Sequence, residues 1–267
     1  MRGVLMLQGV LWVSILLLLS ASLYPRRERM LLGAAGWWAF CVHWLLQPSH
    51  YAAIADWYNV VVTLGAAALC ALIGYLMLSF YRGSPALSER ALLTLTRASA
   101  IGGMVYFPFA QLDTLQSMLE MEVASQTVWL VGALGHAALL LPPSHIVVQG
   151  FDIEIVLACT AIESIALFTG LILATDAAGR RKLMALLASV PVIYVLNLFR
   201  NAFVVIATGY LWFSSDPYES FYVAHAVLAK VGSTLALVAI AYVVLWLLPE
   251  LLDVIDEFVS LLRRRGR

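Results

Sequence analysis

About eight segments of this chain consist almost entirely of apolar residues, and most approach the 20 or so residues that a helix needs to cross a bilayer. The chain is 63% hydrophobic and only 12% charged, about half the charged share of a soluble domain. The predicted fold is an all-α, polytopic transmembrane helical bundle of seven or eight hydrophobic segments. These segments are 3–23, 30–46, 58–80, 98–110, 126–141, 154–175, 183–208 and 225–248.

The spacing of these segments leaves no room for a soluble domain of any size. The first segment is long enough to span a bilayer and no soluble domain follows it, so it is interpreted as a retained helix rather than a signal peptide. The expected organisation is a transmembrane region over 1–141, a catalytic transmembrane core of the same domain over 142–248 and a basic cytoplasmic tail over 249–267. The net charge of zero argues against nucleic acid as a partner.

Positive charges predict how the chain is oriented in a cell membrane. Arginine and lysine mark the cytoplasmic side in short loops, and four clusters contain them: 26–29, 82–97, 180–182 and 263–265. Loops without either residue are 47–57, 111–125, 142–153 and 214–222, and these are predicted to be external. Placing all four clusters inside requires an odd number of crossings. The preferred topology has seven crossings and an external N-terminus, with one re-entrant or interfacial segment near 98–141.

Among the polar residues that interrupt the apolar segments between 154 and 248 are Cys159, Arg200 and His225. Ionisable groups inside a membrane are costly and usually have a functional reason to be there. Arg200 lies about 26 Å along a helix from Leu183, near the predicted external surface. Cys159 and His225 each lie near the external start of a segment. All three are therefore expected at one depth, where they form the parts of a thiol acyl-transfer site.

Cys159 is the predicted nucleophile. A thiolate is the reactive form of cysteine, and a nearby cation favours it, so Arg200 or His225 would activate this residue. The alternative is a packing cysteine, which is the interpretation given to Cys41 and Cys70.

Arg200 carries five donors in a fixed fork and can stabilise a thiolate or an oxyanion. Asn197 and Asn201 flank it, which favours a polar pocket over an arginine that extends to the membrane surface.

His225 can deliver a proton to a leaving amine, although a structural histidine is the more common case. Glu163 follows Cys159 by four residues, a spacing that places both on one face of a helix. It is expected to pair with Arg200, to orient His225, or to serve as a structural partner for a buried donor. No His-x-x-x-His or Cys-x-x-Cys spacing occurs, so neither a metal nor a cofactor is expected.

The motifs at 158–161 (Ala-Cys-Thr-Ala), at Asn197-x-x-Arg200-Asn201 and at His225 resemble the exosortase/archaeosortase family. The longer string Ala-Cys-Thr-Ala-Ile-Glu-Ser most resembles its archaeosortase branch, which recognises C-terminal signals containing Pro-Gly-Phe. The resemblance covers about 150–235. It implies a membrane transpeptidase in which Cys159 is the nucleophile, Arg200 its electrostatic partner and His225 the third site residue. Some archaeal members use a further arginine, and none occurs here between Arg200 and Arg263.

The implied substrates are precursor proteins that end in a short motif, a hydrophobic helix and a basic tail. The enzyme would cut at the motif on the external side and transfer the new carboxyl end to a membrane lipid. Two alternatives stay open: an intramembrane cysteine protease that ends in hydrolysis, and a non-enzymatic transporter or assembly factor with Arg200 and Glu163 along a path. The absence of an internal repeat argues against a transporter.

Overall fold

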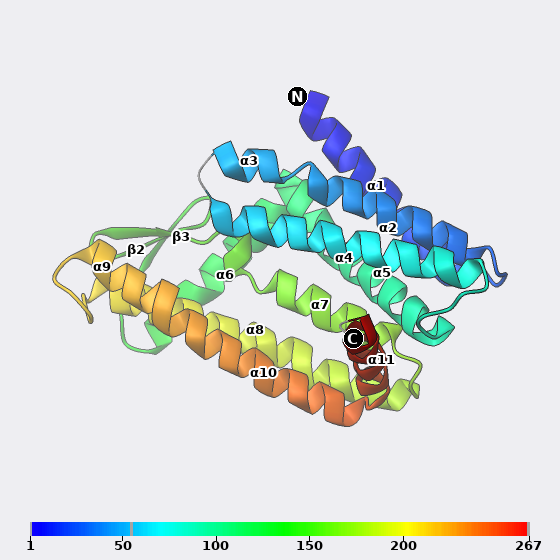
Figure 1. Ribbon diagram of the computed structural model, residues 1–267. Coiled ribbons are helices and arrows are strands. Elements are labelled where there is room, and N and C mark those ends of the chain that lie inside the picture. The colour runs from blue at the N-terminus through cyan, green and yellow to red at the C-terminus, as the bar shows by residue number, and fades with distance from the viewer. Residues whose placement is uncertain (1, 54–55, 266–267) are drawn as a thin grey trace. The chain divides into compact units, whose positions relative to one another are not determined.

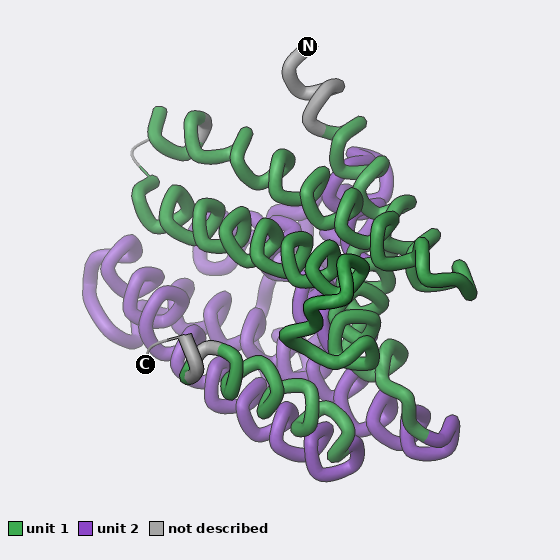
Figure 2. Tube along the Cα trace, turned by 45° about the vertical axis from the view of Figure 1, so that its right-hand side comes forward, with its two compact units in different colours: residues 1–104, 170–177, 249–267 green, residues 105–169, 178–248 purple. Residues whose placement is uncertain are grey.

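Most of the chain is helical, as its long apolar segments predict (Figure 1). The computed structural model describes residues 2–53 and 56–265. Two compact units are coloured separately in Figure 2. Unit 1 comprises 1–104, 170–177 and 249–267, and unit 2 comprises 105–169 and 178–248.

Unit 1 is built from helices that pack on one another through small and apolar side chains. Helix α2 packs along both α1 and α4, and α5 completes the cluster. The fully buried core includes Leu18, Met30, Met77 and Leu92. The helices of this unit are α1 (Arg2–Leu23), α2 (Arg29–Leu45), α3 (Pro48–Ala53), α4 (Trp57–Tyr81), most of α5 (Glu89–Gln111), the end of α7 (Ile162–Ala174) and α11 (Glu250–Arg265).

Asp56 caps the first turn of α4. Its carboxylate accepts hydrogen bonds from the Asn59 backbone N–H (3.1 Å) and from the Asn59 side-chain amide (2.6 Å). The side-chain bond and then the backbone bond lower the pKa of Asp56 below its ordinary value. The helix therefore begins where a polar residue can satisfy its free N–H groups.

Unit 2 surrounds a second apolar core, which includes Val123, Val131, Ile146 and Val205. Its longest helix, α8, packs against α6 and α10. The elements of this unit are the end of α5, α6 (Asp113–Ala133), strands β1 (Leu139–Leu141), β2 (His145–Val148) and β3 (Phe151–Glu154), the 3-10 turn η1 (Leu157–Cys159), the start of α7, α8 (Gly179–Gly209), α9 (Pro217–Phe221), the π-helix η2 (Tyr222–Ala229) and α10 (Lys230–Leu247).

The three strands form an antiparallel sheet in the order β1-β2-β3. The sequence predicts an all-α fold, so this sheet was not expected. The β2–β3 hairpin closes through Gln149 and Gly150, which both have positive φ, as a tight two-residue turn requires. A Cβ atom on Gly209 would meet the side chain of Val148. The sheet therefore packs against the C-terminal end of α8.

Two sequence predictions are wrong in this region. Residues 111–125 are not a loop, because α6 begins at Asp113, and 126–141 is not one apolar helix, because α6 ends at Ala133 and β1 follows. Helix α6 contains charged and amide side chains that bond to one another, Gln116 to Glu120 and Gln126 to Glu122. A search for uniformly apolar runs does not detect such a helix.

Three helical stretches of the described chain are long and apolar enough to cross a membrane: Trp57–Tyr81, Gly179–Gly209 and Pro217–Leu247. Two shorter apolar helices are Gln8–Leu23 and Ile162–Ala174. On α10, one face exposes large apolar side chains at helical spacing: Val231, Leu235, Val238, Tyr242 and Trp246. A stripe of this kind suits contact with lipid tails, and the chain is a helical membrane protein.

Candidate functional site

Cys159 lies at the end of a short 3-10 turn and not on a long helix. Its backbone N–H donates to the Val156 carbonyl (2.7 Å), and the Thr160 hydroxyl donates to the Leu157 carbonyl (2.7 Å). Ala161 has a φ of 64°, a left-handed conformation that is uncommon for a residue with a Cβ atom. Such strained positions cluster at functional sites.

The backbone at Ala161 changes the expected relation between Cys159 and Glu163. Helix α7 begins at Ile162, so the two residues do not share a helical face as their spacing predicts. The Glu163 carboxylate instead accepts a hydrogen bond from the Tyr106 hydroxyl (3.2 Å). This contact is exposed, and the expected roles of Glu163 stay predictions. Tyr106 has no motif around it, so the sequence contains no signal of this contact.

Two side-chain amides of α8 hold the backbone of Cys159. The Asn197 and Asn201 side-chain amides donate to the Cys159 carbonyl, at 2.7 Å and 2.9 Å. These asparagines are four residues apart and therefore lie on one face of α8. Asn201 is only 3% exposed. The α8 helix thus determines where the Cys159 turn is placed.

Arg200 joins this arrangement through the same buried amide. Its Nη1 donates to Asn201 Oδ1 at 3.2 Å, while Asn201 Nδ2 donates to the Cys159 carbonyl. Asn201 therefore connects the guanidinium to the cysteine backbone. The sequence predicts that Cys159, Arg200 and the two asparagines belong to one site, and the structure brings all four together.

A cavity of about 570 Å³ lies next to the Cys159 turn, entirely within unit 2. Arg200, Asn197 and Glu163 line it, as do Ala158 and Ala161 on either side of Cys159. Its other walls are mainly apolar and come from α8, η2 and α10: Ile193, Leu196, Phe199, Phe203, Leu228, Ala236, Leu237 and Ile240. The cavity lining combines polar side chains close to the Cys159 turn with apolar walls suited to an apolar ligand.

The Cys159 side chain and His225 are not among the described residues that line the cavity. The Cys159 side chain is half-buried and packs against the apolar core of unit 2. Lys230, Ser233 and Thr234 of α10 also line the cavity, and none of them is among the residues that the sequence predicts for the site. The position of Lys230, five residues after His225, is the one feature of the sequence that could have indicated a place in the site.

His225 lies in the π-helix η2 and stacks on the Phe221 ring, with centroids 5.0 Å apart and planes at 8°. It interacts electrostatically with Arg200 and with Lys230. A π-helix is rare and often marks a functional site. The structure therefore places His225 in the electrostatic environment of Arg200. The described residues contain no group of three His, Cys, Asp or Glu side chains that could hold a metal ion.

Comparisons with known proteins agree with these motifs. The family model described as "Transmembrane exosortase (Exosortase_EpsH)" matches residues 8–215, well over half of the chain. That match includes Cys159, Arg200 and the two asparagines, and it ends before His225. No solved structure shows a significant match.

Two curated relatives extend the similarity over almost the whole chain. Archaeosortase A of Natronomonas pharaonis is 30% identical over 282 residues, covering 94% of this chain and 87% of the relative. Archaeosortase A of Haloferax volcanii is 32% identical over 282 residues, covering 92% of this chain and 90% of the relative. From the extent of the family match and these two similarities, the chain belongs to the exosortase/archaeosortase family of transmembrane proteins.

Proposed function

We propose that this protein is a membrane-embedded cysteine transpeptidase. It cleaves the C-terminal sorting signal of surface proteins on the external side and transfers the new C-terminus to a membrane lipid. The observation that carries the proposal is the convergence of Asn197, Asn201 and Arg200 on the Cys159 turn beside a largely apolar cavity. Membership of the family supports the reaction class. Within the chain we assign catalysis to 142–248, with 1–141 as the remaining transmembrane region and 249–267 as a cytoplasmic tail.

The first step forms a thioester. The Cys159 thiolate attacks the carbonyl carbon of the scissile peptide bond, and Arg200 stabilises the negative charge that moves to the carbonyl oxygen. The C–N bond then breaks, and His225 gives its proton to the departing amine of the hydrophobic helix. A lipid amine or related acceptor attacks the thioester, loses a proton to His225 and regenerates the thiolate. If water attacks instead, the same steps amount to hydrolysis.

Asn197 and Asn201 act by positioning. Because both amides bind the Cys159 carbonyl, they limit the movement of the turn that carries the nucleophile. Correct placement of reacting groups contributes strongly to rate, and an error of about 1 Å can cost on the order of 100-fold. The buried Asn201 also orients the Arg200 guanidinium.

The cavity suits a substrate that is itself anchored in the bilayer. Its apolar walls from α8 and α10 accommodate the hydrophobic helix of a sorting signal or the tail of a lipid, and Arg200 and Asn197 line it close to the Cys159 turn. A substrate helix that is held in the same membrane diffuses in two dimensions, which raises its effective concentration at the site.

The arrangement of unit 2 supports an external site. The β2–β3 hairpin packs near Gly209 at the C-terminal end of α8, and the loop 210–216 also leaves from this end. Both segments lack arginine and lysine, whereas Arg180, Arg181 and Lys182 lie at the other end. Asn201 precedes Gly209 by eight residues, about 12 Å along the helix. Under the positive-inside rule, Cys159 is therefore nearer to the external surface.

The direct test compares processing of a tagged precursor by cysteine variants of the full-length protein. Cys159→Ala and Cys159→Ser should insert normally and should abolish processing, so that precursors with an intact C-terminal helix accumulate. The matched control is Cys70→Ala, which changes a cysteine buried in unit 1. The mass of the mature C-terminus distinguishes a lipid-linked product from a hydrolysed one. Normal processing by Cys159→Ala would disprove the assignment of the nucleophile.

A further inference from the structure

The C-terminal helix α11 (Glu250–Arg265) has the charges of a helix that does not cross the membrane. Its first half contains four acidic residues, and its end contains three arginines: Glu250, Asp253, Asp256, Glu257, Arg263, Arg264 and Arg265. Negative charge near the N-terminus and positive charge near the C-terminus both stabilise a helix. The same distribution makes burial of the whole helix in hydrocarbon very costly.

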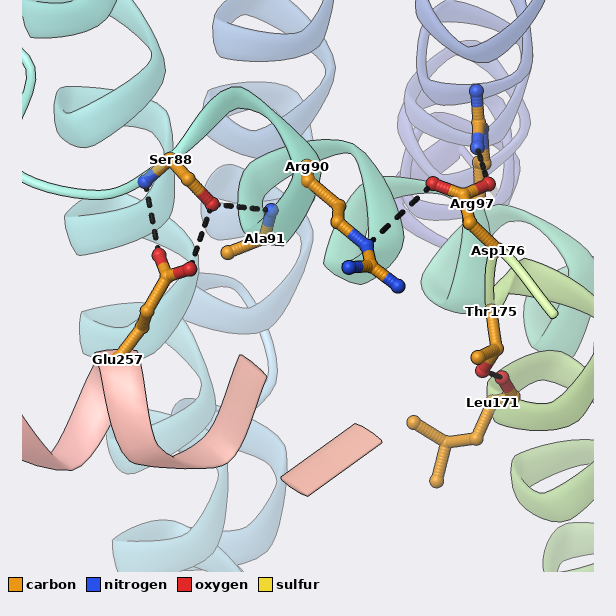
Figure 3. Close-up of polar contacts among 8 residues, drawn as sticks. All are labelled: Ser88, Arg90, Ala91, Arg97, Leu171, Thr175, Asp176 and Glu257. Carbon is orange, nitrogen blue, oxygen red and sulfur yellow. Dashed lines mark hydrogen bonds and ion pairs between the residues drawn. The ribbon is translucent and has the colours of Figure 1, made fainter. Parts of the chain in front are cut away.

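One side of α11 is packed within the chain. Leu251, Val254 and Leu261 are less than a tenth exposed, and Leu261 and Phe258 pack against the apolar core of unit 1. A polar contact anchors the helix: the backbone N–H and the hydroxyl of Ser88 donate to the Glu257 carboxylate, at 3.0 Å and 2.9 Å (Figure 3).

This anchor also serves the start of α5. The Ser88 hydroxyl oxygen accepts a hydrogen bond from the Ala91 backbone N–H at 3.1 Å, as in a helix cap (Figure 3). Helix α11 is therefore held in a defined rotation about its axis, because Glu257 and the buried apolar stripe bind to unit 1 together.

A second apolar stripe on α11 stays exposed as a result. Leu252, Ile255 and Val259 are 42%, 46% and 38% exposed. They are separated by three and four residues and so lie on one face of the helix. Since Leu251 and Leu252 are consecutive, the exposed stripe adjoins the buried one at about 100° around the helix. The apolar part of α11 is thus wider than its packing within the chain requires.

We propose that α11 is an interfacial helix whose exposed stripe (Leu252, Ile255 and Val259) binds the surface of an anionic lipid bilayer. The position of α11 along the chain indicates that a lipid bilayer covers this stripe. Only Leu248 and Pro249 separate α11 from the apolar stretch Pro217–Leu247, which is long enough to cross the membrane, so α11 begins at a membrane surface. An amphipathic helix at that position lies in the plane of the interface with its apolar side toward the acyl chains.

The charge at the end of α11 selects the kind of lipid. Arg263, Arg264 and Arg265 follow the exposed stripe, and arginines next to a bilayer are attracted by anionic headgroups. The acidic residues Asp253 and Asp256 are exposed and face away from the buried stripe, toward water. The helix thus has three faces: one that binds lipid, one that faces water and one that packs against unit 1. This inference does not depend on the proposed transpeptidase reaction.

The test measures the environment of single labels on the full-length protein in nanodiscs. An environment-sensitive fluorophore is attached at Val259→Cys or at Ser260→Cys, with Cys41, Cys70 and Cys159 changed to alanine. Ser260 is the matched control, because it is the next residue and lies about 100° away on the polar side. The label at 259 should be blue-shifted, quenched by lipid-borne nitroxide and protected from aqueous iodide, whereas the label at 260 should show the reverse.

Lipid charge is then varied with the label fixed at 259. Replacing neutral phosphatidylcholine with a mixture that contains phosphatidylglycerol should increase the fraction of the fluorophore that is protected from iodide. Each arginine changed to glutamine at 263–265 should reduce the protected-to-exposed ratio by about fivefold in the anionic bilayer. Equal iodide quenching at 259 and 260 would overturn the proposal. Protection that persists without lipid, or that follows the protein concentration, would also overturn it, because a second copy would then cover the stripe.

Discussion

At the scale of single residues, the Arg200 guanidinium donates one hydrogen bond to Asn201, and the proposed role of Arg200 in stabilising an oxyanion uses its planar fork of donors. We predict that Arg200→Lys is nearly as damaging as Arg200→Ala. A lysine keeps the charge but cannot reproduce the guanidinium geometry. The loss of one oxyanion-stabilising donor costs about 100- to 1,000-fold in rate. The measurement is the rate of precursor processing in proteoliposomes, and a lysine variant of normal rate would contradict a specific donor role.

His225 lies in the electrostatic environment of Arg200, and it can serve either as a proton donor or as a fixed charge. If proton delivery is its role, His225→Ala should slow processing by about 100- to 10,000-fold and should leave precursor binding largely intact. His225→Gln should be equally slow, whereas appreciable activity of His225→Arg would favour the role of a fixed charge. The control is Phe221→Leu, which removes the stacked ring and keeps the imidazole. Near-normal turnover of the alanine variant would reduce His225 to a structural residue.

At the scale of helices, α5 and the C-terminal end of α7 approach closely within unit 1. A Cβ atom on Gly170 would clash with the Ala98 carbonyl oxygen and would lie 3.0 Å from the Gly102 backbone nitrogen. Arg97 and Arg90 of α5 form ion pairs with Asp176, at 3.1 Å and 3.9 Å (Figure 3). Small residues at a helix crossing allow backbones in a membrane to pack closely.

We predict that Gly170→Val lowers the free energy of unfolding by about 1–3 kcal/mol, because the added side chain forces α5 and α7 apart. The matched control is Gly65→Val on α4, where a Cβ atom meets nothing within 4 Å. The measurement is the apparent melting temperature of both variants in the same detergent. An unchanged melting temperature for Gly170→Val would show that the crossing is not as tight as its geometry indicates.

At the scale of the whole molecule, the orientation in the membrane can be tested without any measurement of activity. Cysteines introduced at Ser215 and at Gln149 should react with an impermeant reagent from outside the cell, whereas one at Ala178 should not. All three positions are exposed. Ser144, in the same predicted external loop as Gln149, is 1% exposed and is unsuitable for labelling. Labelling of residue 178 from outside would invert the topology and place Cys159 near the cytoplasmic surface.

Hydropathy was sufficient to predict the helical membrane fold and most of the long helices. The segments 58–80 and 183–208, for example, correspond closely to α4 and α8. Whether a segment is stable in lipid depends on its own composition, so each membrane-spanning helix can be predicted from its own residues. Helix α11 and the first part of α6 were not predicted because both contain too many charged and amide side chains to form uniformly apolar segments. Their helical form depends on a partner surface elsewhere in the chain.

The sequence by itself determined the helical membrane fold, and it predicted from residue types, order and spacing that Cys159, Arg200 and the two asparagines form one site. Only the tertiary structure decided how they are connected. The Asn201 amide joins the Arg200 guanidinium to the Cys159 carbonyl, a relation between residues about 40 positions apart. The left-handed backbone at Ala161 separates Cys159 from α7 and leaves Glu163 bonded to Tyr106. Hydrogen bonds between distant segments depend on distances that the fold sets, so local sequence patterns do not contain them.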